Sequence, residues 1–179
     1  FVFAFILVLF FMIFYYKRAG WVANVALIAN VFFIIGTLAS LGAALTLPGI
    51  AGLVLTIGMS VDANVLIYER VREELKNGKG IKLAVQDGYK HAYSAIIDAN
   101  VTSLLTALVL AYFGSGPIQG FATTLIIGVF TSLFCAIFVT RLIFSYLMDT
   151  KREVQFSRKI TENLFTGTTI SFMKKRKVF

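Results

Sequence analysis

Five apolar runs constrain this sequence more than any other feature. They cover residues 1–16, 21–45, 49–68, 93–113 and 118–142, and charged residues are rare within them. About 20 helical residues cross the roughly 30 Å hydrocarbon core of a bilayer. The composition agrees, because 58% of the residues are hydrophobic and 15% are charged, against about 45–50% and about 25% in soluble domains. The sequence therefore predicts an all-α fold, a polytopic bundle of five transmembrane helices within residues 1–144.

The basic residues all lie on one side of this arrangement. Of the 17 Lys and Arg residues, two follow the first run, six lie in the connection 69–92 and nine lie from Arg141 onward, whereas the turns 46–49 and 114–117 contain none. Loops rich in Lys and Arg remain in the cytoplasm. We therefore expect the N-terminus outside, and the connection and a basic tail, 145–179, inside. The same asymmetry accounts for the net charge of +8 without nucleic-acid binding.

The polar connection is predicted to be largely helical. The third run continues as a helix with an ion-paired face until Asn77 and Gly78 stop it. Beyond Gly80, apolar residues recur at helical spacing from Ile81 to Gly88. This spacing predicts an amphipathic cytoplasmic helix that lies on the membrane face.

One carboxylate lies inside the third run. Asp62 is about two turns from the cytoplasmic end, with Ser60 and Asn64 beside it in the sequence. A charged group at the centre of a span costs at least about 2.5–3.5 kcal/mol and commonly marks an ion or proton pathway. A carboxylate in such a polar notch can gain and lose a proton as water or a cation approaches. Asp62 and Asn64 are therefore proton-relay candidates, and the alternative is an Asp that only hydrogen-bonds a neighbouring helix.

The fourth run contains a second polar stripe. Asp98, Thr102 and Thr106 are spaced by four residues and so share one helical face, with Asn100 and Ser103 beside them. The stripe could line a wetted path, with Asp98, Asn100, Thr102 and Thr106 as further proton-relay candidates, or hold helices together through hydrogen bonds. We favour helix contacts for the hydroxyl residues and a functional role for Asp98.

Several other residues are interpreted as packing elements. Thr124, Gly128 and Ser132 repeat at four-residue spacing, as do Gly36 and Ser40, and such small residues let helices approach closely. Asn30, midway in the second run, is expected to form an interhelical hydrogen bond.

The reactive side chains do not form a catalytic or metal-binding set. Cys135 is the single cysteine, inside the fifth run, and is expected to behave as a small hydrophobic residue. His91 is the single histidine and is expected at the interface or in solvent. Neither a metal site nor a nucleophile with its base can be assembled from them, so we expect no enzyme activity and no cofactor.

Two segments carry a resemblance to a known family. GMSVDANVLIYERVREEL, from Gly58, and the stretch from Ser94 to Leu142 that begins SAIIDANVTS resemble signature regions of SecD, the membrane component of bacterial SecDF in the RND superfamily. The resemblance implies an RND-like half-transporter in the bacterial cytoplasmic membrane. It also implies work with SecF, the SecYEG channel and SecA, in which the proton gradient promotes translocation of a polypeptide.

The resemblance assigns particular residues. Asp62 and Asn64, supported by Glu69 and Arg70, match the first Asp-x-Asn motif of the family. Asp98 and Asn100 match the second motif.

The ends of the chain depart from the family pattern. The large periplasmic domain that the family carries before the first span is absent here, as is the SecF half, so we expect both ends to be truncated. The segment from Thr169 to Lys177 resembles the stretch that leads into the first SecF helix, and Lys151 to Thr168 precede it. This implies a cytoplasmic linker within a fused SecD-SecF chain, and the alternative is an ordinary basic tail.

Two other classes of protein stay open at this point. An RND-type drug or lipid exporter would also place acids in the third span, but those pumps usually carry adjacent aspartates, whereas Ala63 follows Asp62. A scaffold without transport activity would use its acids only for packing. Whether Asp62 titrates distinguishes a scaffold from a transporter.

Overall fold

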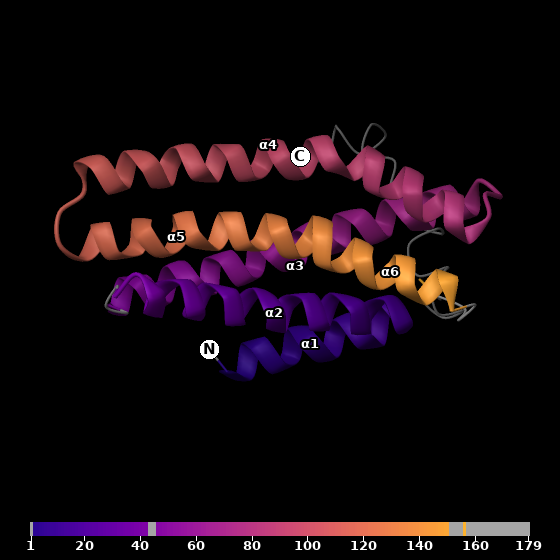
Figure 1. The fold of residues 1–179 in the computed structure, drawn as a ribbon, viewed down its shortest axis with the longest axis horizontal. Helices are drawn as coiled ribbons and strands as arrows, with labels where there is room; N and C mark the ends of the chain where they lie inside the picture. The colour runs from indigo at the N-terminus through magenta and orange to yellow at the C-terminus, as the bar shows by residue number, and fades with distance from the viewer. Residues whose placement is uncertain (1, 43–45, 151–155, 157–179) are drawn as a thin grey trace, which may run out of the picture.

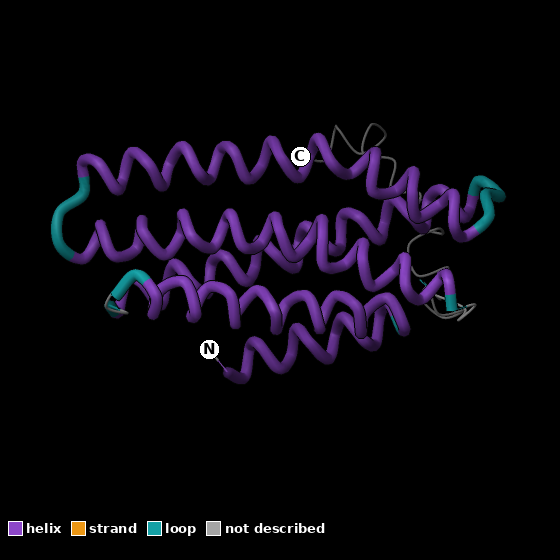
Figure 2. Tube along the Cα trace, viewed as in Figure 1, coloured by secondary structure: helices purple, strands orange, loops and turns teal. Residues whose placement is uncertain are grey.

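Every regular element in the described part of the chain is a helix. The computed structural model describes residues 2–42, 46–150 and 156, and Figures 1 and 2 show helices joined by short loops. The predicted all-α fold class is therefore confirmed. The elements are α1 (Val2–Tyr16), α2 (Arg18–Ser40), α3 (Leu47–Lys76), α4 (Ile81–Phe113), α5 (Pro117–Phe134), the π-helical η1 (Cys135–Val139) and α6 (Thr140–Asp149).

Four helical segments are long and apolar enough to cross a membrane. They are α2, α3, α4 and the continuous segment Pro117–Asp149, which joins α5, η1 and α6. The first predicted span forms the 15-residue helix α1, which at 1.5 Å per residue is only about 22 Å long. The described chain thus contains four full-length apolar helices and one shorter one.

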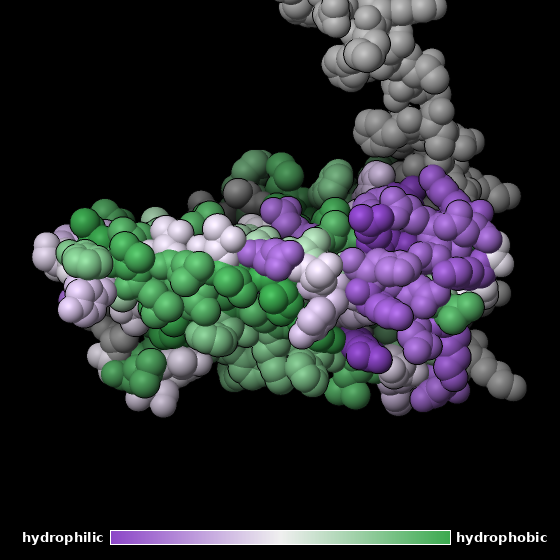
Figure 3. Space-filling view, turned by 90° about the horizontal axis from the view of Figure 1, so that it is seen from above, coloured by the Kyte–Doolittle hydropathy of each residue, from purple (hydrophilic) through white to green (hydrophobic). Residues whose placement is uncertain are grey.

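The helices run along one common axis, and their connections gather at two ends of the bundle (Figure 1). The reversal between α1 and α2, the loop between α3 and α4 and the end of α6 lie at one end, and the two other turns lie at the opposite end. In Figure 3 the hydrophilic surface is concentrated at the first of these ends, and the rest of this face is mostly apolar. This separation agrees with the one-sided distribution of Lys and Arg.

Helix α3 lies at the centre of the bundle and contacts α2, α4 and α5. At Gly128 of α5, an added Cβ atom would lie 2.6 Å from Cβ of Thr56 on α3, so glycine is needed for this close approach. Thr124 and Ser132 on the same face are buried, which confirms the predicted packing stripe. The other predicted pair was wrong within the described chain, because nothing lies within 4 Å of a Cβ added at Gly36.

The predicted connection 69–92 forms a helical hairpin that extends both neighbouring spans. Its first part belongs to α3, and its second part opens α4 rather than forming a separate helix on the membrane face. At Gly88 an added Cβ would lie 2.9 Å from the backbone nitrogen of Val71, so the two helices pack almost backbone to backbone. Ala84 and Tyr89 are buried on the same side. Burial against α3 therefore replaces the expected burial against lipid.

An aromatic cluster lies near the hydrophilic end of the bundle, which we call the polar end (Figure 3). The ring of Tyr68 on α3 lies 5.3 Å from that of Tyr16, 5.7 Å from that of Phe144 and 5.9 Å from that of Phe156. The hydroxyl group of Tyr89 lies 2.6 Å from that of Thr140, which directly follows the π-helical turn. These contacts join α1, α3, α4 and α6. Apart from its first residues and Phe156, the predicted tail 145–179 lies outside the described residues.

Candidate proton-relay site

The structure places Asp62 on an exposed strip of α3, between two hollows. The first hollow, of about 150 Å³, lies between α3 and α4 and is lined by Asp62, Asn100, Ser103 and mainly apolar side chains. The second, of about 350 Å³, lies between α1 and α3 and has Asp62 as its only charged lining residue. Among the described residues, the Asp62 carboxylate has neither a hydrogen bond nor an ion pair. An isolated carboxylate therefore opens onto apolar grooves in the middle of a predicted span.

The two Asp-x-Asn motifs place their Asp and Asn residues on different sides of each helix. Residues two apart are about 200° apart around a helix of 3.6 residues per turn. Accordingly Asp62 and Asp98 are exposed, whereas Asn64 and Asn100 are buried. Asp62 and Asn64 therefore do not form one notch, and the polar residues that share a groove with Asp62 are Asn100 and Ser103 of α4.

Both buried asparagines leave an acceptor unused. Nδ2 of Asn64 donates to the carbonyl of Ser60 at 3.0 Å, and Nδ2 of Asn100 donates to the carbonyl of Ile96 at 2.8 Å. Their Oδ1 atoms are buried and have no donor within the described chain, and for Asn30 neither Oδ1 nor Nδ2 has a hydrogen-bond partner there. The interhelical hydrogen bond expected for Asn30 is thus not found there. A buried acceptor without a donor is costly, and at Asn100 it borders the groove that Asp62 lines.

The polar stripe of α4 is split by this arrangement. Thr102 donates to the carbonyl of Asp98 at 2.9 Å, and Thr106 donates to that of Thr102 at 3.1 Å, so both exposed threonines bond within their own helix. Ser103 turns into the groove, where its hydroxyl lies 3.6 Å from Sδ of Met59 on α3. The structure therefore brings Asn100 and Ser103 to Asp62, and leaves Asp98, Thr102 and Thr106 outside the groove lining.

Glu69 connects α1 to α3. Its Oε1 atom accepts from the hydroxyl of Tyr16 at 2.9 Å and from Nη1 of Arg72 at 2.8 Å. Arg72 also donates to the hydroxyl of Tyr15 at 3.1 Å and lies 5.2 Å from the centroid of that ring. Its side chain is only 7% exposed, against 43% for Glu69. By contrast, Arg70 forms an exposed pair with Glu73 at 2.7 Å.

The spacing in the sequence predicted an ion pair of Glu69 with Arg72 on a solvated face. The structure confirms the pair, but sequence reasoning missed the tyrosines and the burial of Arg72. Tyr16 and Glu69 are separated by 53 residues, so no local spacing predicts their hydrogen bond. The available signal was the pair of tyrosines that ends the first apolar run.

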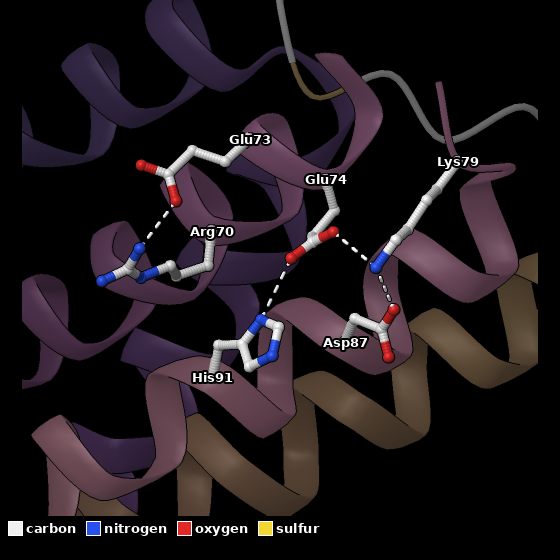
Figure 4. Close-up of polar contacts among 6 residues, drawn as sticks. All are labelled: Arg70, Glu73, Glu74, Lys79, Asp87 and His91. Carbon is white, nitrogen blue, oxygen red and sulfur yellow. Dashed lines mark hydrogen bonds and ion pairs between the residues drawn. The ribbon is translucent and has the colours of Figure 1, made fainter. Parts of the chain in front are cut away.

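Lys79 lies in the loop of the α3–α4 hairpin and forms ion pairs with both helices (Figure 4). Its Nζ atom lies 2.7 Å from Oε2 of Glu74 and 2.6 Å from Oδ2 of Asp87. Nδ1 of His91 lies 3.0 Å from Oε1 of Glu74. The hydrogen bonds to Asp87 and Glu74 raise the pKa of Lys79, and the hydrogen bond from Lys79 lowers the pKa of each carboxyl group. His91, 53% exposed, thus belongs to a solvated ion-pair network outside the predicted spans.

The fold and this site define a class: a multi-pass α-helical membrane protein with an isolated carboxylate on a central apolar helix. The family model for "Protein export membrane protein SecD/SecF, C-terminal" matches residues 1–150. The chain belongs to this SecD/SecF family and corresponds to the membrane portion of SecD, which confirms the resemblance found in the sequence.

Named relatives and solved structures agree with this membership. The chain is 59% identical over 143 residues to the protein translocase subunit SecD of Rhodothermus marinus, and 55% identical over 142 residues to that of Syntrophobacter fumaroxidans. These matches cover 80% and 79% of the chain but only 23% and 27% of the relatives. A crystal structure of SecDF, a translocon-associated membrane protein from Thermus thermophilus, is 36% identical with a TM-score of 0.85, and the match covers 97% of this chain and 23% of that one. SecDF in its super-membrane-facing form is 42% identical with a TM-score of 0.78, covering 81% and 20%.

Proposed function

We propose that this chain is the membrane part of a Sec protein-export subunit, in which proton binding at Asp62 promotes translocation of a polypeptide. The names of its relatives support the export role. The observation that supports the proton role is the unpaired carboxylate of Asp62, which shares a groove with Asn100. The proposal favours export over a drug or lipid exporter because the named relatives are translocase subunits.

Protonation changes what Asp62 can do in that groove. A carboxylate only accepts hydrogen bonds, whereas a neutral carboxyl group also donates one. The unused Oδ1 atom of Asn100 is an acceptor on the facing helix. Protonation also removes the cost of a charge among apolar side chains. Both effects favour closer packing of α3 and α4 in the protonated state.

The proton gradient is large enough to drive such a change. One charge that crosses 100 mV releases about 2.3 kcal/mol, which shifts a two-state equilibrium about fiftyfold. The hydrogen bond of Glu69 with Tyr16 links α3 to α1. Through this link, a change in the packing of α3 and α4 could be transmitted to a periplasmic domain joined to α1. In this mechanism the proton need not meet the polypeptide.

The proposed orientation has the N-terminus outside and the loop between α3 and α4 in the cytoplasm, as the Lys and Arg distribution predicts. Single cysteines at Pro48 and Gly78, in a variant without Cys135, test it with a membrane-impermeant thiol reagent. In intact spheroplasts the reagent should label Pro48→Cys, and it should label Gly78→Cys only after the membrane is opened. Labelling in the reverse order would contradict the orientation.

The proposed partners are SecF, fused or separate, the SecYEG channel, SecA and the translocating polypeptide. The solved neighbours are SecDF structures, one of them described as translocon-associated, which supports SecF and an association with the translocon. The exposed strip of α3 around Asp62 offers a surface on which further transmembrane helices of the full-length protein could pack.

The test of the proposed function is Asp62→Asn in the full-length protein. Export that depends on the proton gradient should be lost, while the amount of protein in the membrane stays normal, because removal of an unpaired charge also removes its desolvation cost. Asp149→Asn, at the end of α6, is the matched control and should export normally. Normal proton-dependent export in Asp62→Asn at wild-type membrane levels would refute the proton role.

A further inference from the structure

A third groove, apart from the two hollows beside Asp62, lies at the polar end of the bundle between the start of α4 and α6. It has a volume of about 130 Å³ and two basic side chains, Lys82 from α4 and Arg141 from α6. The uncharged polar side chains of Gln86 and Ser145 also line it. The rest of the lining is formed by Val85, Tyr89 and Met148.

The charge of this groove is not neutralised by the described chain. Lys82 and Arg141 come from elements about 60 residues apart in the sequence, and neither forms an ion pair with a described residue. The nearest acid along α4, Asp87, is bonded to Lys79 at 2.6 Å, and no carboxylate lines the groove. Two cations with an amide and a hydroxyl group therefore converge on one small space, which favours an anion with several acceptor oxygens.

The surroundings of the groove are apolar and face outward. On α6, Leu142 is 72% exposed and Tyr146 is 70% exposed, and Phe138 is exposed one turn earlier. Exposed tyrosines at the end of a predicted span are typical of the headgroup level of a membrane. Arg141 thus lies beside a surface suited to acyl chains, whereas a site for a soluble anion needs no such surface.

We propose that this groove binds the phosphate group of an anionic phospholipid in the cytoplasmic leaflet. Arg141 and Lys82 contact the phosphate oxygens, and Gln86 and Ser145 donate hydrogen bonds to the same headgroup. The acyl chains lie along the exposed face of α6 at Leu142. Basic pockets between transmembrane helices on the cytoplasmic side are a known means of lipid recognition. This site is separate from the Asp62 groove and does not depend on the proton role.

The test measures lipid binding to the purified full-length protein. Native mass spectrometry in detergent, with added phosphatidylglycerol or phosphatidylcholine, compares wild type with Lys82→Gln/Arg141→Gln. We expect phosphatidylglycerol to bind wild type in preference to phosphatidylcholine, and to bind the double variant about 10- to 30-fold more weakly. The matched control, Lys76→Gln/Lys90→Gln, removes two exposed cations outside the groove and should bind phosphatidylglycerol nearly as wild type does.

Three results would overturn the proposal. The first is an equal loss of phosphatidylglycerol binding in the test and control variants, since bulk charge would then explain the attraction. The second is equal binding of the two lipids to wild type. The third is displacement of phosphatidylglycerol by millimolar inorganic phosphate, which would indicate a soluble-anion site. If the double variant does not fold, Arg141→Lys, which keeps the charge but loses bidentate geometry, must weaken binding in the same direction.

Discussion

At the scale of single residues, the acids of the first motif have different tasks. Asp62 has no partner among the described residues, whereas Glu69, two turns further along α3, has two. Glu69 is a charged partner of Arg72, whose side chain is almost fully buried. We therefore interpret Glu69 as the residue that fixes α1 on α3, whereas Asp62 makes no such contact among the described residues.

Glu69→Gln should destabilise the protein by about 1–3 kcal/mol, because the charge-assisted hydrogen bond from Arg72 and the hydrogen bond from Tyr16 both lose their carboxylate acceptor in a partly buried position. The full-length protein in detergent, followed by thermal unfolding, gives the measurement. Glu73→Gln is the matched control, since it breaks the exposed pair with Arg70 and should cost no more than about 0.5 kcal/mol. Equal effects of the two substitutions would contradict the structural role of Glu69.

At the scale of helices, the contact of α3 with α5 depends on glycine. Gly128→Ala places a methyl group against Thr56 and should destabilise the bundle by about 1–3 kcal/mol through overpacking. Gly36→Ala is the control, because nothing lies within 4 Å of the added atom, and it should be close to neutral. Thermal unfolding of both variants checks this prediction. A neutral Gly128→Ala would show that α3 and α5 can separate without loss.

The hairpin tip should respond to pH through Lys79. The pKa values of Glu74 and Asp87 are lowered, so their contribution is present above the unfolded-state values near 4 and is lost as the pH falls through the lowered values. The pKa of Lys79 is raised, so its contribution persists up to about pH 10. The amides of 81–88 should therefore exchange faster at pH 3 than at pH 7, after correction for intrinsic rates.

Lys79→Met should reproduce at pH 7 the faster hydrogen exchange that acid causes in wild type. Lys76→Met, which removes an exposed lysine from the end of α3, is the control and should leave the exchange of 81–88 unchanged. If the two variants exchange alike, the ion pairs of Lys79 do not hold the tip.

The apolar runs were sufficient to predict the helices, because length and hydropathy act locally along the chain. The same reasoning misplaced the segment from Ile81 to Gly88, since an apolar stripe at helical spacing fits a membrane face and a neighbouring helix equally well. It also grouped Asp62 with Asn64 by proximity in sequence, although the helical period places them on different faces. The groove shared by Asp62 and Asn100 and the hydrogen bond between Tyr16 and Glu69 depend on how the helices pack, which no local pattern contains.

At the scale of the whole molecule, the bundle is closed at its polar end and open around Asp62. The aromatic cluster of Tyr16, Tyr68 and Phe144 joins α1, α3 and α6 near the polar end, where the two ring contacts limit movement. Nearer the middle of the spans, α3 and α4 are separated by the groove that Asp62 lines. This distribution favours a motion in which α3 and α4 change their spacing at the groove while the polar end holds.

A crosslink across the groove tests whether Asp62 controls that motion. Ser103 and Met59 face each other, with 3.6 Å between the hydroxyl oxygen and the sulfur atom, so Met59→Cys and Ser103→Cys in a full-length protein without Cys135 report the spacing of α3 and α4. With Asp62 present, the fraction of protein that forms the disulfide should differ between pH 5 and pH 8. This difference should be larger than the one measured with Asp62→Asn. Because Asn resembles the neutral carboxyl group in both charge and donor capacity, that variant should stay near the low-pH spacing at both values. The same thiols are oxidised at the same pH in both proteins, so thiol ionisation cancels in the comparison. A pH response that is equal in wild type and Asp62→Asn would mean that Asp62 does not control the spacing and that its role is limited to packing.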